Sequence, residues 1–286
     1  MGRGCMNYRE CYEEGRRILV AAKLTEADLD ARLLLEHVCG TGRHDLLVHG
    51  DREVAEPQLR KYLELIGQRA QHIPLQHLTG TQDFMGLTFR VNEHVLIPRQ
   101  DTEILVEEVM KGLHDGMRIL DMCTGSGCIL ISLLHYSNEC VGVGADISKE
   151  ALEVAAANAK AIRGGGQDAL TWMHSDLFEH VEGKFDVIVS NPPYIRSAVI
   201  DTLMPEVREH EPLSALDGSE DGLYFYRRII DQGREYLEHG GQLYFEIGYD
   251  QAAEVSRLME EAGFADIEVV QDYAGLDRVV YGTYVK

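Results

Sequence analysis

The sequence predicts an α/β protein: a mostly parallel sheet with helices on both faces, preceded by a small all-α domain. Three observations support this prediction. In the carboxyl-terminal part of the chain, short apolar runs typical of buried strands alternate with helical periodicities. Residues 7–72 show helical periodicity without strand signals. Between the two parts, residues 84–91 carry aromatic and β-branched side chains around a central glycine, which is the pattern of a β-hairpin.

Residues 1–75 are predicted to form the helical domain. Thr25 is expected to cap one of its helices, which should stop near Gly40. Glu56 and Pro57 open a further helix, because the missing N–H of a proline costs nothing at the first helical position. Residues 74–80 show no periodic pattern, and we expect them to be irregular.

The remainder of the chain is predicted to contain the sheet. Its strands are expected at residues 118–121, 140–145, 170–173, 186–190, 242–247, 267–270 and 279–284. Helical segments separate the first six, which makes these strands parallel. Residues 271–278 are too few for a crossover helix, so the last two strands are expected to be antiparallel. We therefore assign residues 76–100 to a linker with the hairpin and residues 101–286 to a second domain.

Composition and charge limit the classes of function. The chain has 286 residues and a net charge of −21, and a surface that acidic repels phosphate backbones. Direct binding to nucleic acid is therefore disfavoured, and a basic protein partner is favoured. The six cysteines include no Cys-x-x-Cys pair, which argues against a zinc site and a disulfide framework. With no apolar run of membrane-spanning length and no apolar segment at residues 1–6, we expect a cytoplasmic protein with free thiols and no metal.

A glycine loop follows the first strand of the sheet. Its residues are Asp121, Cys123, Thr124, Gly125, Ser126 and Gly127. The dinucleotide fingerprint would need a glycine at position 130, where Leu130 stands, and this disfavours a nicotinamide oxidoreductase. A carboxylate before the loop repels phosphate and can hold an ammonium group. S-adenosyl-L-methionine carries an ammonium group and a carboxylate but no phosphate, so it suits this loop. The alternative is a tight turn without a ligand.

Two acidic residues follow the next strands of the predicted sheet. Asp146 stands about twenty residues past the glycine loop, a spacing at which an acid can bind the two hydroxyls of a ribose. Its alternative role is to cap the next helix. Asp176 is expected to accept the adenine amino group while Leu177 covers the ring. The alternative for Asp176 and Leu177 is an ordinary surface loop.

The tetrapeptide Asn191-Pro192-Pro193-Tyr194 ends the fourth strand. Two prolines cannot continue a strand, so the segment is a stiff elbow at the sheet edge where ligands bind. We expect the Asn191 side-chain oxygen and the Pro192 carbonyl to accept the two N–H groups of a planar NH2 group, while Tyr194 packs on its flat face. The alternative is a proline turn with no chemistry. In the order of the strands, the four motifs would lie along one edge of the sheet, which favours a common site.

With these motifs the chain resembles the HemK family, the protein-(glutamine-N5) methyltransferases that modify peptide chain release factors. The resemblance extends over nearly the whole length. It is carried by residues 74–76, 78–80, 96–99, 101–103, 121, 123–127, 146–148, 158–159, 175–178, 190–195, 211–212, 215–216, 221–222, 246–248 and 275–278. Cys123 stands where many relatives have glycine, and backbone contacts there are expected to survive.

The resemblance implies a Rossmann-like methyltransferase that uses S-adenosyl-L-methionine and releases S-adenosyl-L-homocysteine. The implied substrate is the glutamine of the Gly-Gly-Gln motif in class 1 release factors, which is methylated at its side-chain amide nitrogen. These factors act in translation termination. The helical domain is expected to recognise the release factor, and residues 195–220, without clear regular structure, to shape the peptide entrance. Alternatives are an adenine-N6 methyltransferase on DNA or RNA, which shares the elbow, and a non-catalytic cofactor-binding subunit.

The expected site residues fall into three overlapping groups. The cofactor group is Asp121, Cys123, Thr124, Gly125, Ser126, Gly127, Asp146, Asp176, Leu177 and Asn191. The catalytic group is Asn191, Pro192 and Tyr194, and the substrate group is Asn191, Pro192, Pro193 and Tyr194.

Overall fold

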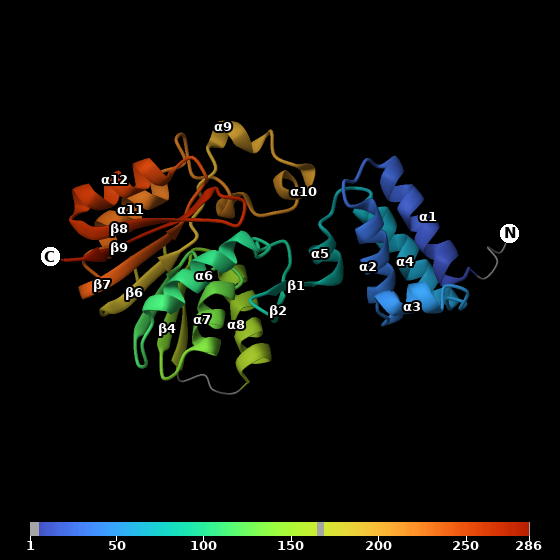
Figure 1. Ribbon diagram of the computed structural model, residues 1–286, viewed down its shortest axis with the longest axis horizontal. Coiled ribbons are helices and arrows are strands. Elements are labelled where there is room, and N and C mark those ends of the chain that lie inside the picture. The colour runs from blue at the N-terminus through green and yellow to red at the C-terminus, as the bar shows by residue number, and fades with distance from the viewer. Residues whose placement is uncertain (1–5, 165–168, 286) are drawn as a thin grey trace. The chain divides into compact units, whose positions relative to one another are not determined.

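The computed structural model describes residues 6–164 and 169–285 (Figure 1). Cys5 and the first residues, on which the expectation about a signal segment rests, lie outside the described residues. Within the described ranges, no helix is long and apolar enough to cross a membrane. The described cysteines are all free thiols.

The chain divides into two compact units. The first contains the residues up to Gly80 together with Met204–His210, and the second contains Thr81–Leu203 and the residues from Glu211 onward. Residues 76–80 of the expected linker thus group with the first unit, and residues 81–100, with the hairpin, group with the second.

The first unit is helical, as predicted. Its helices are α1 (Tyr8–Ala21), α2 (Ala27–Cys39), α3 (Arg43–Val48), α4 (Glu56–Arg69), α5 (Leu75–Thr79) and α10 (Pro205–Arg208). Side chains of α1, α2 and α4 form the core, where Tyr62 is fully buried and donates a hydrogen bond from its hydroxyl to the Ala31 carbonyl at 3.2 Å. A Cβ at Gly15 would lie 1.9 Å from the Tyr62 hydroxyl oxygen, so α1 approaches α4 this closely only with glycine at that position.

Two local predictions for this unit are wrong. Thr25 does not cap α2, because the helix begins at Ala27 and its N-cap is Glu26, which makes no side-chain capping bond. Residues 74–80 are not irregular, because α5 occupies most of them and ends at Gly80 with φ 75°. A helix of five residues is too short to show periodicity. The predicted stop at Gly40 and the start at Glu56 with Pro57 are confirmed.

The second unit contains a seven-stranded sheet within the described part of the chain. Its strands are β3 (Arg118–Met122), β4 (Val141–Asp146), β5 (Leu170–His174), β6 (Phe185–Ser190), β7 (Leu237–Glu246), β8 (Phe264–Gln271) and β9 (Asp277–Tyr284). The strand order is β5-β4-β3-β6-β7-β9-β8. The first five strands in this order are parallel, and β9 is antiparallel to both of its neighbours. All seven predicted strands and the antiparallel final pair are confirmed.

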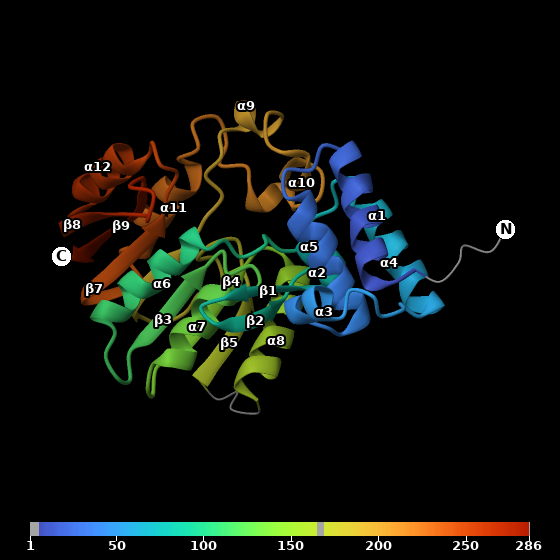
Figure 2. The same ribbon diagram turned by 45° about the vertical axis from the view of Figure 1, so that its right-hand side comes forward.

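Helices cover both faces of the sheet (Figures 1 and 2). Helices α6 (Asp101–Gly112), α7 (Cys128–Tyr136) and α8 (Lys149–Arg163) lie on one face, and α11 (Tyr224–Gly233) and α12 (Ala252–Ala262) lie on the other. Successive residues of β3 serve opposite faces: Ile119 packs in the core under α6 and α7, and Leu120 in the core under α11 and α12. Strand β3 is therefore buried on both sides, as its unbroken apolar run indicates.

The predicted hairpin is confirmed as β1 (Thr81–Phe84) and β2 (Leu87–Arg90), with Phe84 and Phe89 buried in the core under α6 and α7. Residues 195–220 differ from the prediction, because they contain the short helices α9 (Ser197–Ile200), α10 and the 3-10 helix Leu213–Ala215. Helices of three or four residues span about one turn, so they leave no periodic signal in the sequence.

Candidate active site

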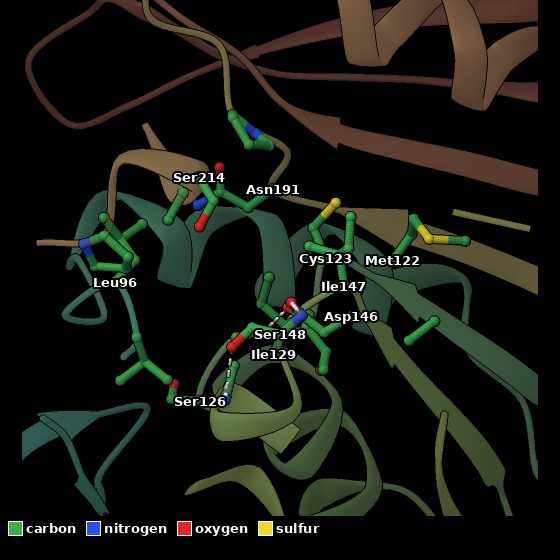
Figure 3. Close-up of a pocket in the computed structure, with 18 of the residues that line it drawn as sticks. Leu96, Met122, Cys123, Ser126, Ile129, Asp146, Ile147, Ser148, Asn191 and Ser214 are labelled. Carbon is green, nitrogen blue, oxygen red and sulfur yellow. Dashed lines mark hydrogen bonds between the residues drawn. The ribbon is translucent and has the colours of Figure 1, made fainter. Parts of the chain in front are cut away.

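A pocket lies at the carboxyl ends of β3, β4, β5 and β6, within the second unit (Figure 3). Its empty volume, part of which is open to solvent, is about 1160 Å³. Of the predicted site residues, those that line it are Cys123, Thr124, Gly125, Ser126, Asp146, Asp176, Leu177, Asn191 and Pro193. Asp121, Gly127, Pro192 and Tyr194 lie outside the lining. The carboxyl ends of parallel strands are the usual ligand site of such sheets.

The glycine loop is tied to the strand ends by hydrogen bonds. The Thr124 backbone N–H donates to the Ala145 carbonyl at 3.1 Å, and the Gly125 N–H donates to Asp146 Oδ2 at 2.9 Å. Gly127 adopts φ 77°, and a Cβ there would lie 2.8 Å from the Trp172 ring, so glycine is required. The loop is therefore a rigid backbone wall of the pocket.

Asp121 lies beneath the loop and is fully buried. Its Oδ2 accepts the Thr124 hydroxyl at 2.5 Å, while Oδ1 has no hydrogen-bond partner of normal geometry among the described residues. Burial raises the pKa of this carboxyl group to about 7, against the opposing effect of the Thr124 hydrogen bond. The carboxyl group thus supports the loop from below and keeps one unused acceptor.

Asp146 presents its carboxylate to the pocket from the end of β4. Oδ2 accepts the Gly125 N–H, and Oδ1 accepts the Ser148 N–H at 2.9 Å. Each oxygen keeps a lone pair for a hydroxyl group of a ligand. Burial raises the pKa of this carboxyl group, and the backbone N–H donors oppose the shift. Ser148, rather than Asp146, caps α8 by accepting the Ala151 N–H at 3.1 Å.

Asp176 stands at the pocket wall beside the buried Leu177. Its Oδ1 accepts a hydrogen bond from Arg228 Nη1 of α11 at 3.0 Å. The guanidinium lies 5.6 Å from the Tyr224 ring centroid, an additional contact that holds it in place. Arg228 was not singled out from the sequence, because a lone arginine on a helix carries no motif.

The elbow continues from β6, with Asn191 at the pocket near Ser214 (Figure 3). The Asn191 Nδ2 donates to Thr102 Oγ1 at 3.4 Å. The Tyr194 hydroxyl donates to Glu246 Oε1 at 3.2 Å. Burial raises the pKa of Tyr194 well above its ordinary value, so its hydroxyl group stays protonated and acts as a donor.

Thr102 and Glu246 join the two ends of this elbow. The Thr102 hydroxyl bonds Glu246 Oε2 at 2.5 Å, and both side chains are buried. Burial raises the pKa of the Glu246 carboxyl group, and the Thr102 hydrogen bond and the Arg278 charge oppose the shift. Both residues lie in stretches that carry the family resemblance, residues 101–103 and 246–248, but the sequence assigned neither of them to the site.

A further part of the wall comes from residues 211–217, which we term the strap. Pro212, Ser214, Ala215 and Asp217 line the pocket from this segment. Glu211, whose side chain is 1% exposed, anchors it by accepting Arg99 Nη2 at 2.6 Å and the Ile97 N–H at 3.4 Å. The strap is thereby fixed to residues 97–99 across the pocket.

Asn158 of α8 connects the hairpin to the glycine loop. Its Oδ1 accepts the Arg90 N–H at 2.7 Å, and its Nδ2 donates to the Arg90 and Ser126 carbonyls at 3.1 and 3.0 Å. The side chain is fully buried, and all of its described contacts are to backbone groups. It therefore fixes the position of Ser126 in the pocket wall.

Two known domain families match the chain. The "PrmC N-terminal domain" matches residues 10–80, and the "Methyltransferase small domain" matches residues 99–206. A solved methyltransferase from Pyrococcus furiosus has the same fold, with a TM-score of 0.55 and 14% identity over 77% of this chain and 99% of that one. Sheet and pocket thus belong to the methyltransferase class.

The curated relatives include proteins named "Release factor glutamine methyltransferase". One from Clostridium botulinum is 40% identical over 93% of this chain and 95% of its own length. Relatives from Agrobacterium fabrum and Geobacter sulfurreducens are 39% and 40% identical, over 93% and 96% of this chain and 93% and 95% of their own lengths. The chain belongs to the release factor glutamine methyltransferase family, which confirms the resemblance seen in its sequence.

Proposed function

We propose that this chain transfers a methyl group from S-adenosyl-L-methionine to the side-chain amide nitrogen of a glutamine. The target is the glutamine of the Gly-Gly-Gln motif in class 1 peptide chain release factors. The names of the relatives support this substrate, and the similarity extends through both units of the chain.

The position of Asn191 carries the proposal. The residue stands at the pocket wall, and its amide nitrogen already has a partner in Thr102 Oγ1. The side-chain oxygen is therefore the group that Asn191 offers to a ligand, and this oxygen can only accept hydrogen bonds. The acceptor suits the N–H of a primary amide.

The polar groups of the pocket fit S-adenosyl-L-methionine better than a phosphate-bearing cofactor. Three carboxylates line the wall, those of Asp146, Asp176 and Asp217. The one arginine in the described lining, Arg99, is paired with Glu211. Asp146 would hold the ribose hydroxyls, Asp176 and Leu177 the adenine, and the glycine loop the methionine end. When bound, the cofactor supplies a methyl group on a positively charged sulfur, and transfer leaves S-adenosyl-L-homocysteine and one proton from the amide.

The elbow residues position the target. The Asn191 oxygen and the Pro192 carbonyl accept the two N–H groups of the glutamine amide, and this directs the nitrogen's out-of-plane electron pair along one line. Tyr194 is held by Glu246 and supports the elbow from behind. An amide nitrogen is a weak nucleophile, so alignment and local electrostatics provide most of the rate enhancement, several kcal/mol by analogy with other positioned reactions.

An adenine-N6 methyltransferase on DNA or RNA shares the elbow but is not favoured. The relatives match both units, and the net charge of −21 opposes a nucleic-acid substrate. The same charge suits a basic protein partner. We further propose that residues 1–75 recognise the release factor, that residues 195–220 shape the peptide entrance, and that the protein acts in the cytoplasm with translation.

Mass spectrometry of a co-expressed release factor tests the function. We expect the Gly-Gly-Gln glutamine to gain one methyl group with the wild-type chain and none with Asn191→Ala. That variant should keep cofactor affinity within about tenfold, because it removes a group that acts on the target. DNA incubated with labelled cofactor should stay unlabelled. If the glutamine stayed unmethylated and the DNA became labelled, the adenine-N6 methyltransferase would replace the proposed function.

A further inference from the structure

We propose that Glu246 is a positioning residue that fixes the orientation of the Asn191 amide group through the hydroxyl of Thr102. The inference rests on the proposed function, in which the Asn191 oxygen faces the target amide. It assigns the direction of every hydrogen bond between the buried strand end of β7 and the elbow.

The chain of hydrogen bonds starts at Glu246, at the end of β7. The charged groups around its carboxylate are Asp101 from α6 and Arg278 from β9, and its direct partners are Thr102 and Tyr194. An ionised carboxylate has acceptors and no donor. Tyr194 donates to Oε1, so Oε2 is the atom that accepts from Thr102.

The second step is the direction of the Thr102 proton. A hydroxyl group has one proton and two lone pairs. Since Glu246 Oε2 at 2.5 Å requires that proton, Thr102 Oγ1 is left as an acceptor toward every other neighbour. Thr102 is 1% exposed, so water competes poorly for these bonds.

The third step is the Asn191 amide, 3.4 Å from Thr102 Oγ1. An acceptor at that place favours the orientation with Nδ2 toward Thr102 and Oδ1 toward the pocket. In the opposite orientation, two NH2 groups would face each other at the target amide, and neither could accept. Since nitrogen and oxygen of an amide have nearly the same shape, hydrogen bonding rather than packing selects the orientation.

The variant Glu246→Gln reverses the direction of the hydrogen bonds from residue 246 through Thr102 to Asn191, while the side chain keeps its size and shape. Tyr194 would hold the glutamine oxygen, which leaves the glutamine NH2 to donate to Thr102. Thr102 would then donate its proton to Asn191 and turn the amide around. We expect kcat to fall about 10- to 100-fold, with KM for the release factor and cofactor affinity changed less than about threefold.

Two Thr102 variants test the route. Thr102→Val removes the hydroxyl and should lower kcat about tenfold or more, whereas Thr102→Ser should restore most of it. Adding Glu246→Gln to Thr102→Val should lower kcat no further, because the connection is already broken. If the kcat of the double variant fell by the product of the two single-variant losses, the route through Thr102 would be overturned. Wild-type kcat retained by Glu246→Gln would overturn the proposal itself.

A matched control is Glu108→Gln on α6, which removes another buried carboxylate from the helix that carries Thr102. Its hydrogen-bond partner is Lys111, so kcat should stay within about twofold of wild type. A kcat loss in the control equal to that of Glu246→Gln would mean that any buried charge near α6 matters, and would overturn the specific role.

A readout without turnover separates this inference from the proposed function. In selectively labelled protein, NMR should show proximity between the Asn191 Nδ2 protons and Thr102 in wild type, and its loss in Glu246→Gln. If wild type shows this contact but methylates no glutamine, the function fails and the orientation stands. If wild type lacks the contact, the orientation fails whatever the activity.

Discussion

At the scale of single residues, several carboxyl groups with raised pKa values lie in or near the pocket wall. Burial raises the pKa values of Asp121, Asp146 and Glu246, and hydrogen bonds to their carboxyl oxygens partly oppose each shift. Groups of this kind are costly in a folded protein unless a ligand or a neighbour uses them. Asp121 is the clearest case, because one of its oxygens has no normal partner among the described residues.

Asp121 makes the stability of the ligand-free protein depend on pH. Its folded pKa of about 7 exceeds the ordinary value, so the folded state binds the proton more tightly than the unfolded state. The stability from this group is full at low pH and is lost as pH rises toward and through 7. Between pH 5 and 8, wild type should lose on the order of 2 kcal/mol more unfolding free energy than Asp121→Asn.

Urea unfolding of both proteins at the two pH values measures this difference. Asp231→Asn is the control, because Asp231 is an exposed partner in a surface ion pair with Arg234. It should follow the wild-type pH dependence. Parallel pH curves for wild type and Asp121→Asn would show that Asp121 does not titrate in this range.

At the scale of elements, an ion pair anchors the first residue of the strap, while hydrogen bonds to Ile195 and Ser197 hold its other end. Glu211 is nearly inaccessible, and its partners Arg99 and the Ile97 N–H both come from the segment before α6. Burial raises the pKa of the Glu211 carboxyl group, and Arg99 opposes the shift. Removing one member of such a pair leaves the other charge buried and unpaired.

Arg99→Gln should therefore loosen the strap over the cofactor site. We expect the dissociation rate of S-adenosyl-L-homocysteine to rise about tenfold, because the pair anchors the end of the strap next to the wall residue Pro212. Stopped-flow displacement measures the rate. In a double-mutant cycle with Glu211→Gln, the two changes should be less than additive, since the double variant has no unpaired charge. Additive effects of the two changes would argue against an anchoring role for the Arg99–Glu211 ion pair.

The strands and the glycine loop were predictable from the sequence because their signals are local. Each strand is an apolar run, and the loop after β3 is a contiguous motif. Thr102 and Glu246 are 144 positions apart in the sequence, and Ile97 and Glu211 are 114 apart. Such pairs become neighbours only through the order of the strands, which no local pattern encodes. The motifs thus located the pocket, and the contacts behind it came from the structure.

At the scale of the whole molecule, the segment after the elbow belongs to both units. The chain leaves the second unit at Leu203, contributes α10 to the first unit, and returns at Glu211. Within the first unit, Glu206 of α10 pairs with Arg69 at 3.1 Å and with His72 at 3.1 Å. Arg69 also binds the buried Asp30 at 2.7 Å. The helical unit thereby holds a segment that lies between the elbow and the strap in sequence.

Glu206→Ala should release α10 from the first unit. Arg69 keeps Asp30 as a partner, so the helical core should stay folded, while α10 loses its main polar anchor. We expect limited proteolysis within residues 201–212 to accelerate about tenfold, which corresponds to ~1.4 kcal/mol of local opening free energy. Glu209→Ala is the control on the same short segment, because Glu209 pairs with Arg208 at the surface. Equal acceleration in both variants would mean that general fraying, rather than the Glu206 anchor, controls this segment. An effect confined to Glu206→Ala would show that the ion pairs of Glu206 hold α10 within the first unit.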